Sequence, residues 1–197
     1  KGESLGLIGT SGVGKTTFVQ ELLRQRIQSF EPPKIDQIVW IDNPLNVGQI
    51  YNQLHNSLQI MNSAIELREW FSLYKVIVVI DDAEHLLSQP EYLDTLLQYL
   101  APVTVFIMSN IHTPSHQIDS QIVLKELDSV TSIDFISNVA ETTNQAEIQA
   151  IYQLAGGNPL ALLMTINNAA IGDTHVDSSV LEYLLKHAYS QLNQHEK

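Results

Sequence analysis

The first two thirds of the chain contain several short apolar runs, and each is bounded by turn-forming or polar residues. Five of these runs are expected to be β-strands: Ser4–Ile8, Gln37–Ile41, Val76–Ile80, Val103–Met108 and Gln121–Leu124. The run V-I-V-V-I at Val76–Ile80 is β-branched throughout and apolar on both faces. That pattern is typical of a central parallel strand buried between two layers of helices.

Between the runs, apolar residues recur close to the 3.6-residue period of a helix. Four helices are expected on this ground: Thr16–Gln28, Val47–Ile60, Ala64–Tyr74 and Pro90–Leu100. Proline at the start of the last segment fits the first turn of a helix. The alternation of strands and helices predicts an α/β fold, with a parallel sheet covered by helices on both faces.

The alternation of strand and helix patterns ends at about residue 128, and no convincing strand follows. Helical patterns are found at Thr131–Glu141, Gln145–Leu154, Leu160–Ala170 and Ser178–Leu192. We therefore expect an α/β domain over residues 1–128 and a small helical subdomain over residues 129–197.

Composition narrows the possible partners. The 197 residues carry 22 acidic and 10 basic side chains, a formal net charge of −12. That balance makes nucleic acid an unexpected partner, because contacts to phosphates need clustered Lys and Arg. The chain has no cysteine, so disulfides and thiolate chemistry are excluded. Nothing resembles a signal peptide or a membrane span of ~20 apolar residues, so we expect a cytoplasmic location and no membrane.

The chain begins with Lys1 rather than Met, only eight residues before Gly9, the first glycine of a glycine-rich loop. We therefore expect it to be an internal piece of a longer protein whose other domains are among its partners.

That loop carries the clearest chemical signal. The segment G-T-S-G-V-G-K-T at Gly9–Thr16 matches G-x-x-x-x-G-K-[ST] and lies between a predicted strand and a predicted helix. Its glycines allow a close approach to an anion, and successive backbone amides then form a nest for phosphates. The start of the following helix adds positive potential there. The residues expected to contact a nucleotide are Gly9, Thr10, Ser11, Gly12, Val13, Gly14, Lys15, Thr16 and Thr17.

Two side chains of the loop have predicted roles of their own. Lys15 can reach the β- and γ-phosphates of a nucleotide and stabilise the charge that develops during hydrolysis. The hydroxyl of Thr16 can bind Mg²⁺. The sequence therefore predicts a site for ATP or ADP together with Mg²⁺.

Polar residues end two of the predicted strands. Asp81 and Asp82 follow the central strand directly, and Ser109 and Asn110 end the next. Ligands of open α/β sheets bind at the carboxyl ends of the strands. We expect Asp81 to hold Mg²⁺ and Asp82 to orient or deprotonate the attacking water, with Glu84 as the alternative base. Asn110 is expected to contact that water or the γ-phosphate. A plain turn or helix cap would explain the same residues without a nucleotide.

The order of these segments resembles a known family. The loop, then D-D-A-E-H-L-L at Asp81–Leu87 and G-G-N-P-L-A-L at Gly156–Leu162, is similar to the STAND class of signalling ATPases and its NB-ARC-like domains in bacterial regulators. The resemblance runs from Leu5 to about Ala170. It implies an ATP/ADP switch with slow hydrolysis that controls the conformation and self-oligomerisation of a larger protein.

The resemblance also implies a role for Pro159, which matches the proline that contacts the nucleotide from the helical subdomain of that family. A start of a helix at Pro159 explains the residue equally well. Two features depart from the family: Met108–Asn110 stands where an arginine sensor is usual, and no winged-helix domain is visible before Lys197. An AAA+-like ATPase that acts on DNA is the alternative, since D-D-A-E-H-L is similar to a motif of those proteins too.

Overall fold

The computed structural model describes residues 2–29, 35–58, 67–112 and 118–170. The helix predicted at 178–192 lies outside the described residues, as does the end of one predicted helix and the start of another within 59–66. The chain divides into two compact units, Lys1–Gly9 with Lys15–Val123 and Thr10–Gly14 with Leu124–Lys197. We call them the sheet unit and the helical unit, and each is described by itself.

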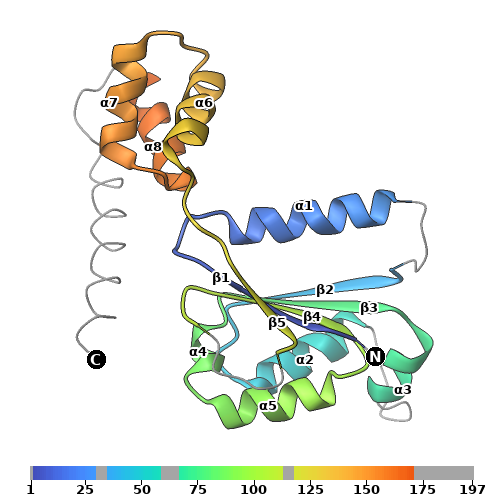
Figure 1. Ribbon diagram of the computed structural model, residues 1–197. Helices are drawn as coiled ribbons and strands as arrows, with labels where there is room; N and C mark the ends of the chain where they lie inside the picture. The colour runs from blue at the N-terminus through green and yellow to red at the C-terminus, as the bar shows by residue number, and fades with distance from the viewer. Residues whose placement is uncertain (1, 30–34, 59–66, 113–117, 171–197) are drawn as a thin grey trace. The chain divides into compact units, whose positions relative to one another are not determined.

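A five-stranded sheet forms the centre of the sheet unit, and all of its strand pairs are parallel (Figure 1). Its strands are β1 (Ser4–Ile8), β2 (Gln37–Asp42), β3 (Val76–Asp81), β4 (Thr104–Ser109) and β5 (Ser120–Val123). They follow the spatial order β2-β3-β4-β1-β5. The predicted parallel sheet is thus confirmed, and β4 lies between the strands that carry the loop and the aspartates.

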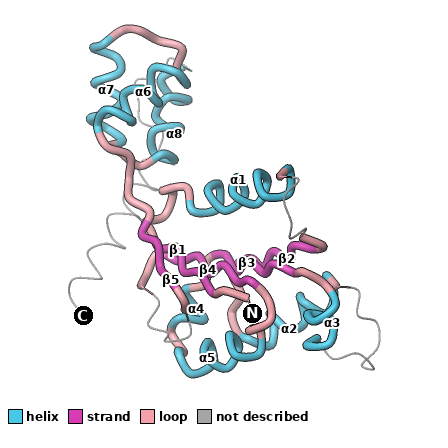
Figure 2. Tube along the Cα trace, turned by 45° about the vertical axis from the view of Figure 1, so that its right-hand side comes forward, coloured by secondary structure: helices cyan, strands magenta, loops and turns pink. Residues whose placement is uncertain are grey.

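Helices cover both faces of this sheet, as predicted. They are α1 (Lys15–Gln28), α2 (Val47–Ser57), α3 (Leu67–Leu73), α4 (Glu84–Leu87) and α5 (Pro90–Tyr99). Figures 1 and 2 show α1 on one face and the other four on the opposite face. The four-residue helix α4 was not predicted, because one turn is too short to show a helical period.

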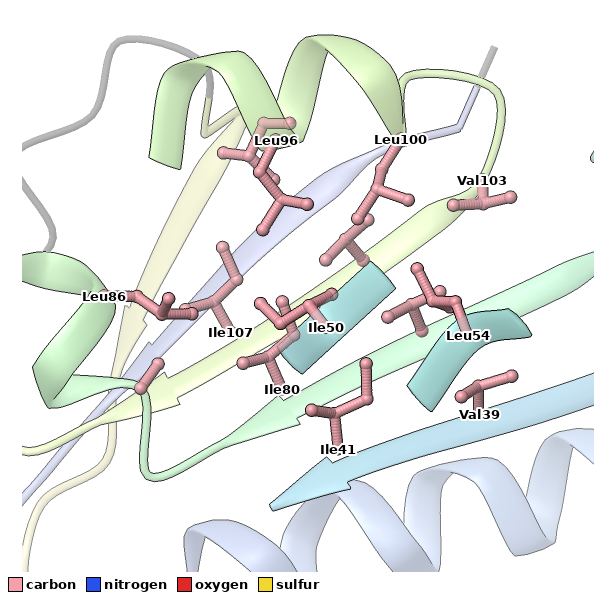
Figure 3. Packing of buried hydrophobic residues seen from close by; sticks show 14 of the residues in the cluster. Val39, Ile41, Ile50, Leu54, Ile80, Leu86, Leu96, Leu100, Val103 and Ile107 are labelled. Carbon is pink, nitrogen blue, oxygen red and sulfur yellow. The ribbon is translucent and has the colours of Figure 1, made fainter. Parts of the chain in front are cut away.

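The main hydrophobic core lies between the sheet and helices α2 to α5. Alternate residues of the central strands, such as Ile80 and Ile107, point into it and contact apolar side chains of α2 and α5 (Figure 3). Ile80, Ile107 and Ile50 of α2 are completely buried. This packing fixes the height of each strand, and therefore the positions of the polar residues at the strand ends.

The helical unit contains α6 (Ser129–Val139), α7 (Gln145–Ala155) and α8 (Pro159–Ala170). These three helices share a small core of their own, made by Ile136, Ile148, Ile151, Ala155, Ala161, Leu162 and Ile166. Asp128 caps α6, since its side chain accepts a hydrogen bond from the Thr131 amide. Among the described residues, no helix is long and apolar enough to cross a membrane.

Candidate functional site

The loop between β1 and α1 has the backbone that its glycines allow. Gly12 and Gly14 have φ angles of 77° and 101°, a region that residues with a Cβ rarely adopt. The Val13 amide donates to the Thr10 carbonyl at 3.3 Å, which closes a tight turn. The Gly9 amide donates to the Ser109 carbonyl at 3.1 Å, so the loop begins as a continuation of the pairing between β1 and β4.

Lys15 is the first residue of α1 and is only 8% exposed. Its Nζ donates a 2.7 Å hydrogen bond to the Gly9 carbonyl, across the start of the loop. Burial lowers the pKa of Lys15, and the negative charges of Glu84, Asp82 and Asp81 oppose that shift. An anionic phosphate beside Nζ would favour the charged lysine still further.

Thr16 and Asp81 meet at the carboxyl end of β3. The Thr16 hydroxyl donates to Oδ2 of Asp81 at 2.8 Å, and the Asp82 amide donates to Oδ1 of Asp81 at 3.0 Å. Burial raises the pKa of Asp81, while these two hydrogen bonds work in the opposite direction. Both carboxylate oxygens are therefore held in place beside the hydroxyl.

The pair fits the chemistry of Mg²⁺, which prefers oxygen ligands and binds through one or two protein groups plus phosphates and water. Among the described residues, no group of three or more His, Asp or Glu could hold a metal ion alone. An ion at Thr16 and Asp81 would therefore need phosphate oxygens or water to complete its coordination.

The other predicted polar residues gather at the ends of β3 and β4. Asp82 is exposed and has a φ of 49°, a left-handed conformation that is uncommon outside glycine. Glu84 is partly buried, and its Oε1 accepts a 2.7 Å hydrogen bond from the Asn110 amide. The Ser109 hydroxyl is bonded to the Ile111 carbonyl. Glu84, the alternative base, is thus hydrogen-bonded to the main chain at the polar end of β4.

Thr17 and Pro159 have predicted contacts with a nucleotide that stay predictions. Thr17 is exposed in the first turn of α1, and Pro159 is partly buried at the first position of α8. The structure also contains a residue that the sequence reading missed. Asn158 is buried, and its Nδ2 donates to the Ser11 carbonyl of the loop at 2.9 Å. An asparagine before a proline signals a helix cap, but it does not reveal a partner 147 positions away.

Comparison of the sequence with protein-family models and with curated proteins finds no match. Comparison of the fold with solved structures does find similar proteins. One is a STAND signal-transduction ATPase with a tetratricopeptide repeat sensor from Pyrococcus horikoshii, with a TM-score of 0.56 and 18% identity; the match covers 94% of this chain and 30% of that one.

Two further structures belong to proteins of another kind. The ORC2 protein of Aeropyrum pernix, solved in ADPNP–ADP complexes, matches with a TM-score of 0.58 and 14% identity over 94% of this chain and 62% of that one. Drosophila ORC bound to DNA matches with a TM-score of 0.56 and 15% identity over 93% of this chain and 55% of that one. This chain thus spans less than two thirds of the length of each of the three. It has the α/β fold of P-loop nucleoside-triphosphatases of the AAA+ and STAND types.

Proposed function

We propose that this chain is an ATP- and ADP-binding switch with slow, Mg²⁺-dependent ATP hydrolysis. The observation that carries the proposal is the hydrogen bond between Thr16 and Asp81, next to a glycine-rich loop whose lysine is buried. Hydroxyl, carboxylate and lysine are the three groups that phosphoryl transfer in this fold requires around a polyphosphate.

Hydrolysis in such a site depends on positioning and on charge stabilisation. Lys15 would stabilise the charge that develops on the γ-phosphate. Asp82 would orient or deprotonate the attacking water, and Asn110 would contact that water or the γ-phosphate from the end of β4. Mg²⁺, held by Thr16 and Asp81, would neutralise charge on the β- and γ-phosphates.

The distribution of basic residues supports slow turnover. Residues 124–170 contain one basic side chain, Lys125, and it is exposed. An arginine that stabilises the transition state is worth ~10³–10⁵ in rate in related enzymes. The described part of the helical unit contains no arginine, so a slow basal rate is expected of the isolated chain.

Control of a larger protein is supported by analogy of fold. The matched Pyrococcus protein combines its ATPase with a repeat sensor, and this chain corresponds to 30% of its length. We propose that exchange of ADP for ATP here changes the conformation or the self-association of a longer protein, rather than supplying a metabolic product.

Calorimetric titration of the wild-type chain with ATP and ADP, in Mg²⁺ and in EDTA, tests the proposal. Lys15→Ala is expected to abolish binding, because it removes the charge that faces the phosphates. Lys75→Ala is the matched control, since Lys75 is exposed and directly precedes β3, at the opposite end of the strand from Asp81. Near-normal affinity of the Lys15 variant would contradict the assignment of the loop.

A second candidate function is an ATPase that acts on DNA. The match to Drosophila ORC bound to DNA favours it, whereas the net charge of −12 weighs against it. Fluorescence anisotropy with a labelled duplex at low salt, together with an ATPase assay with and without DNA, separates the two. Stimulation of hydrolysis by DNA would favour this second function, and no binding at low salt would remove it.

A further inference from the structure

The loop predicted to bind phosphates is hydrogen-bonded to the start of α8. Nδ2 of Asn158 donates to the Ser11 carbonyl at 2.9 Å, and the Leu160 amide donates to the Gly12 carbonyl at 3.2 Å. Asn158 is 5% exposed and Ser11 is exposed, so the hydrogen bond between them is partly buried. Residues 10–14 belong to the same compact unit as α8, although they directly follow β1 in the sequence.

The carbonyls of Ser11 and Gly12, which are consecutive in the loop, are therefore both held by residues at the start of α8. A peptide unit is planar and trans, so its carbonyl and its N–H point in opposite directions. Fixing the Ser11 carbonyl fixes the direction of the Gly12 N–H. Fixing the Gly12 carbonyl fixes that of the Val13 N–H, which donates to the Thr10 carbonyl and closes the turn. Amides of this loop are the groups that would bind phosphate oxygens. The contacts with α8 thus orient the Gly12 amide, which a phosphate could use, and hold the turn that surrounds it.

Asn158 also caps its own helix. Its Oδ1 accepts from the Ala161 amide at 3.2 Å, which is the usual contact of an N-cap residue with the third helical position. Capping alone needs only an acceptor, and Asp or Ser would supply one. The contact with the Ser11 carbonyl needs a donor as well. An amide side chain has both groups, so asparagine can serve both partners at once.

We propose that Asn158 is a positioning residue for the phosphate loop, and that its hydrogen bond to Ser11 couples nucleotide binding to the ordering of α8. The proposal rests on the proposed function of the loop. Coupling of this kind is reciprocal: if an anchored loop binds ADP better, then bound ADP must stabilise the anchored state of α8. Asn158 thereby becomes the link through which the helical unit responds to the nucleotide.

The variant Asn158→Asp separates the two roles of the residue. Aspartate keeps an acceptor for the Ala161 amide but loses the donor, and it places a negative oxygen against the Ser11 carbonyl. The matched control is Asn167→Asp, which makes the same change at an exposed position of the same helix. Asn158→Ser is a second, uncharged variant: its hydroxyl can cap the helix but is too short to reach Ser11 in the same way.

Two measurements on the whole chain test the proposal: calorimetric affinity for ADP, and hydrogen–deuterium exchange of α8 with and without ADP. In the wild type, ADP is expected to slow exchange in α8. In both Asn158 variants the affinity should fall about five- to tenfold, the lower end of typical coupling between sites. ADP at saturating concentration should then no longer slow exchange in α8. The Asn167 variant should behave as the wild type does.

Unchanged ADP affinity in both Asn158 variants would overturn the proposal, and so would α8 exchange that ignores ADP in the wild type. Suppose that one of these results is found while the wild type binds ADP and Lys15→Ala does not. The nucleotide site would then stand, and only the coupling to α8 would fail. A wild-type chain that binds no nucleotide would overturn the coupling and the proposed function together.

Discussion

The hydroxyl of Thr16 lies 2.8 Å from Oδ2 of Asp81, although 65 positions separate the two residues and β4 lies between β1, which precedes the loop, and β3, which carries Asp81. Thr16 belongs to the first turn of α1, directly after the loop, and Asp81 ends β3. A hydroxyl and a carboxylate at hydrogen-bonding distance can both bind one Mg²⁺ ion, because each offers an oxygen ligand.

Substitution of this pair is expected to remove the dependence of ATP binding on Mg²⁺. In Asp81→Ala the affinity for ATP in Mg²⁺ should fall about tenfold or more, toward the value measured in EDTA, because the carboxylate that holds the ion is gone. Thr16→Ala should act in the same direction. Titration calorimetry in both buffers measures the effect.

Asp42→Ala provides the control for that experiment. Asp42 is exposed and ends β2 at the position that pairs with Asp81 in the register of the two strands. It should keep the full response to Mg²⁺. A Mg²⁺ response that survives in Asp81→Ala would show that the ion is bound elsewhere.

Asp81 is also expected to lower the stability of the nucleotide-free protein. Burial raises its pKa above the ordinary value of 3.8, so the folded state holds the proton more tightly than the unfolded state does. The free energy of unfolding then falls as the pH rises from the unfolded-state pKa of Asp81 through its higher folded-state pKa. Asp81→Asn keeps one oxygen for the Thr16 hydroxyl and loses the one that accepts from the Asp82 amide. Because it removes the buried charge, it should still raise Tm by about 1–3 °C at neutral pH.

The pH dependence of that gain provides the check. Below the unfolded pKa both states hold the proton, so the advantage of Asp81→Asn should disappear in thermal melts near pH 3. A variant that is less stable than the wild type at pH 7 would mean that ionised Asp81 stabilises the fold. Stability gained together with loss of the Mg²⁺ response would identify Asp81 as a residue retained for chemistry.

Hydrolysis should depend on the carboxylates that follow Asp81. We expect Asp82→Asn to reduce the single-turnover rate of ATP hydrolysis by about 10²-fold with little change in ATP affinity, since general-base assistance contributes ~10²–10⁴. Glu84→Gln keeps an acceptor for the Asn110 amide and removes only the charge. A larger loss in Glu84→Gln than in Asp82→Asn would transfer the role of base to Glu84. Glu91→Gln, at an exposed position of α5, is the control.

Gly157 should be the glycine that the helical unit tolerates least when it is replaced. A Cβ at this position would lie 2.1 Å from the Leu127 carbonyl oxygen, and the Gly157 carbonyl accepts a 2.9 Å hydrogen bond from the Leu127 amide. Because the obstacle is backbone, Gly157→Ala should lower the free energy of unfolding by ~2 kcal/mol or more. Urea denaturation measures the change. Gly48→Ala, in the helix α2, should cost far less, and equal losses would contradict the steric explanation.

Much of the sheet unit could be predicted because its signals are local. The apolar run at Val76–Ile80 and the helical period after the glycine-rich loop depend on neighbours in sequence, and both elements are present. The order of the strands could not be read, since it depends on pairing between distant segments. Helix α4 escaped prediction because four residues carry no period.

The candidate site likewise has a part that could be predicted from local sequence and a part that could not. Residue types and spacing were enough to single out Lys15, Thr16 and Asp81, whose chemistry needs those side chains at strand and helix ends. Two contacts depend on tertiary packing instead: that of Glu84 with the Asn110 amide, and that of Asn158 with Ser11. No local pattern encodes either contact. The sequence singled out Glu84 and Asn110 but not the bond between them, and it did not single out Asn158.

The position of β4 in the sheet has a consequence for how tolerant the site is to change. Adjacent strands lie about 4.8 Å apart, so the single intervening strand spaces β1 and β3 by roughly 10 Å. Main-chain hydrogen bonds from Gly9 to Ser109 and from Ala83 to Met108 tie both flanks to that strand. The spacing is therefore set by backbone geometry, whatever side chains β4 carries. Substitutions in β4 must still fit the core, because Ile107 is completely buried, but they leave this spacing unchanged. Inserting or deleting one residue in β4 would instead shift Lys15 and Asp81 relative to each other.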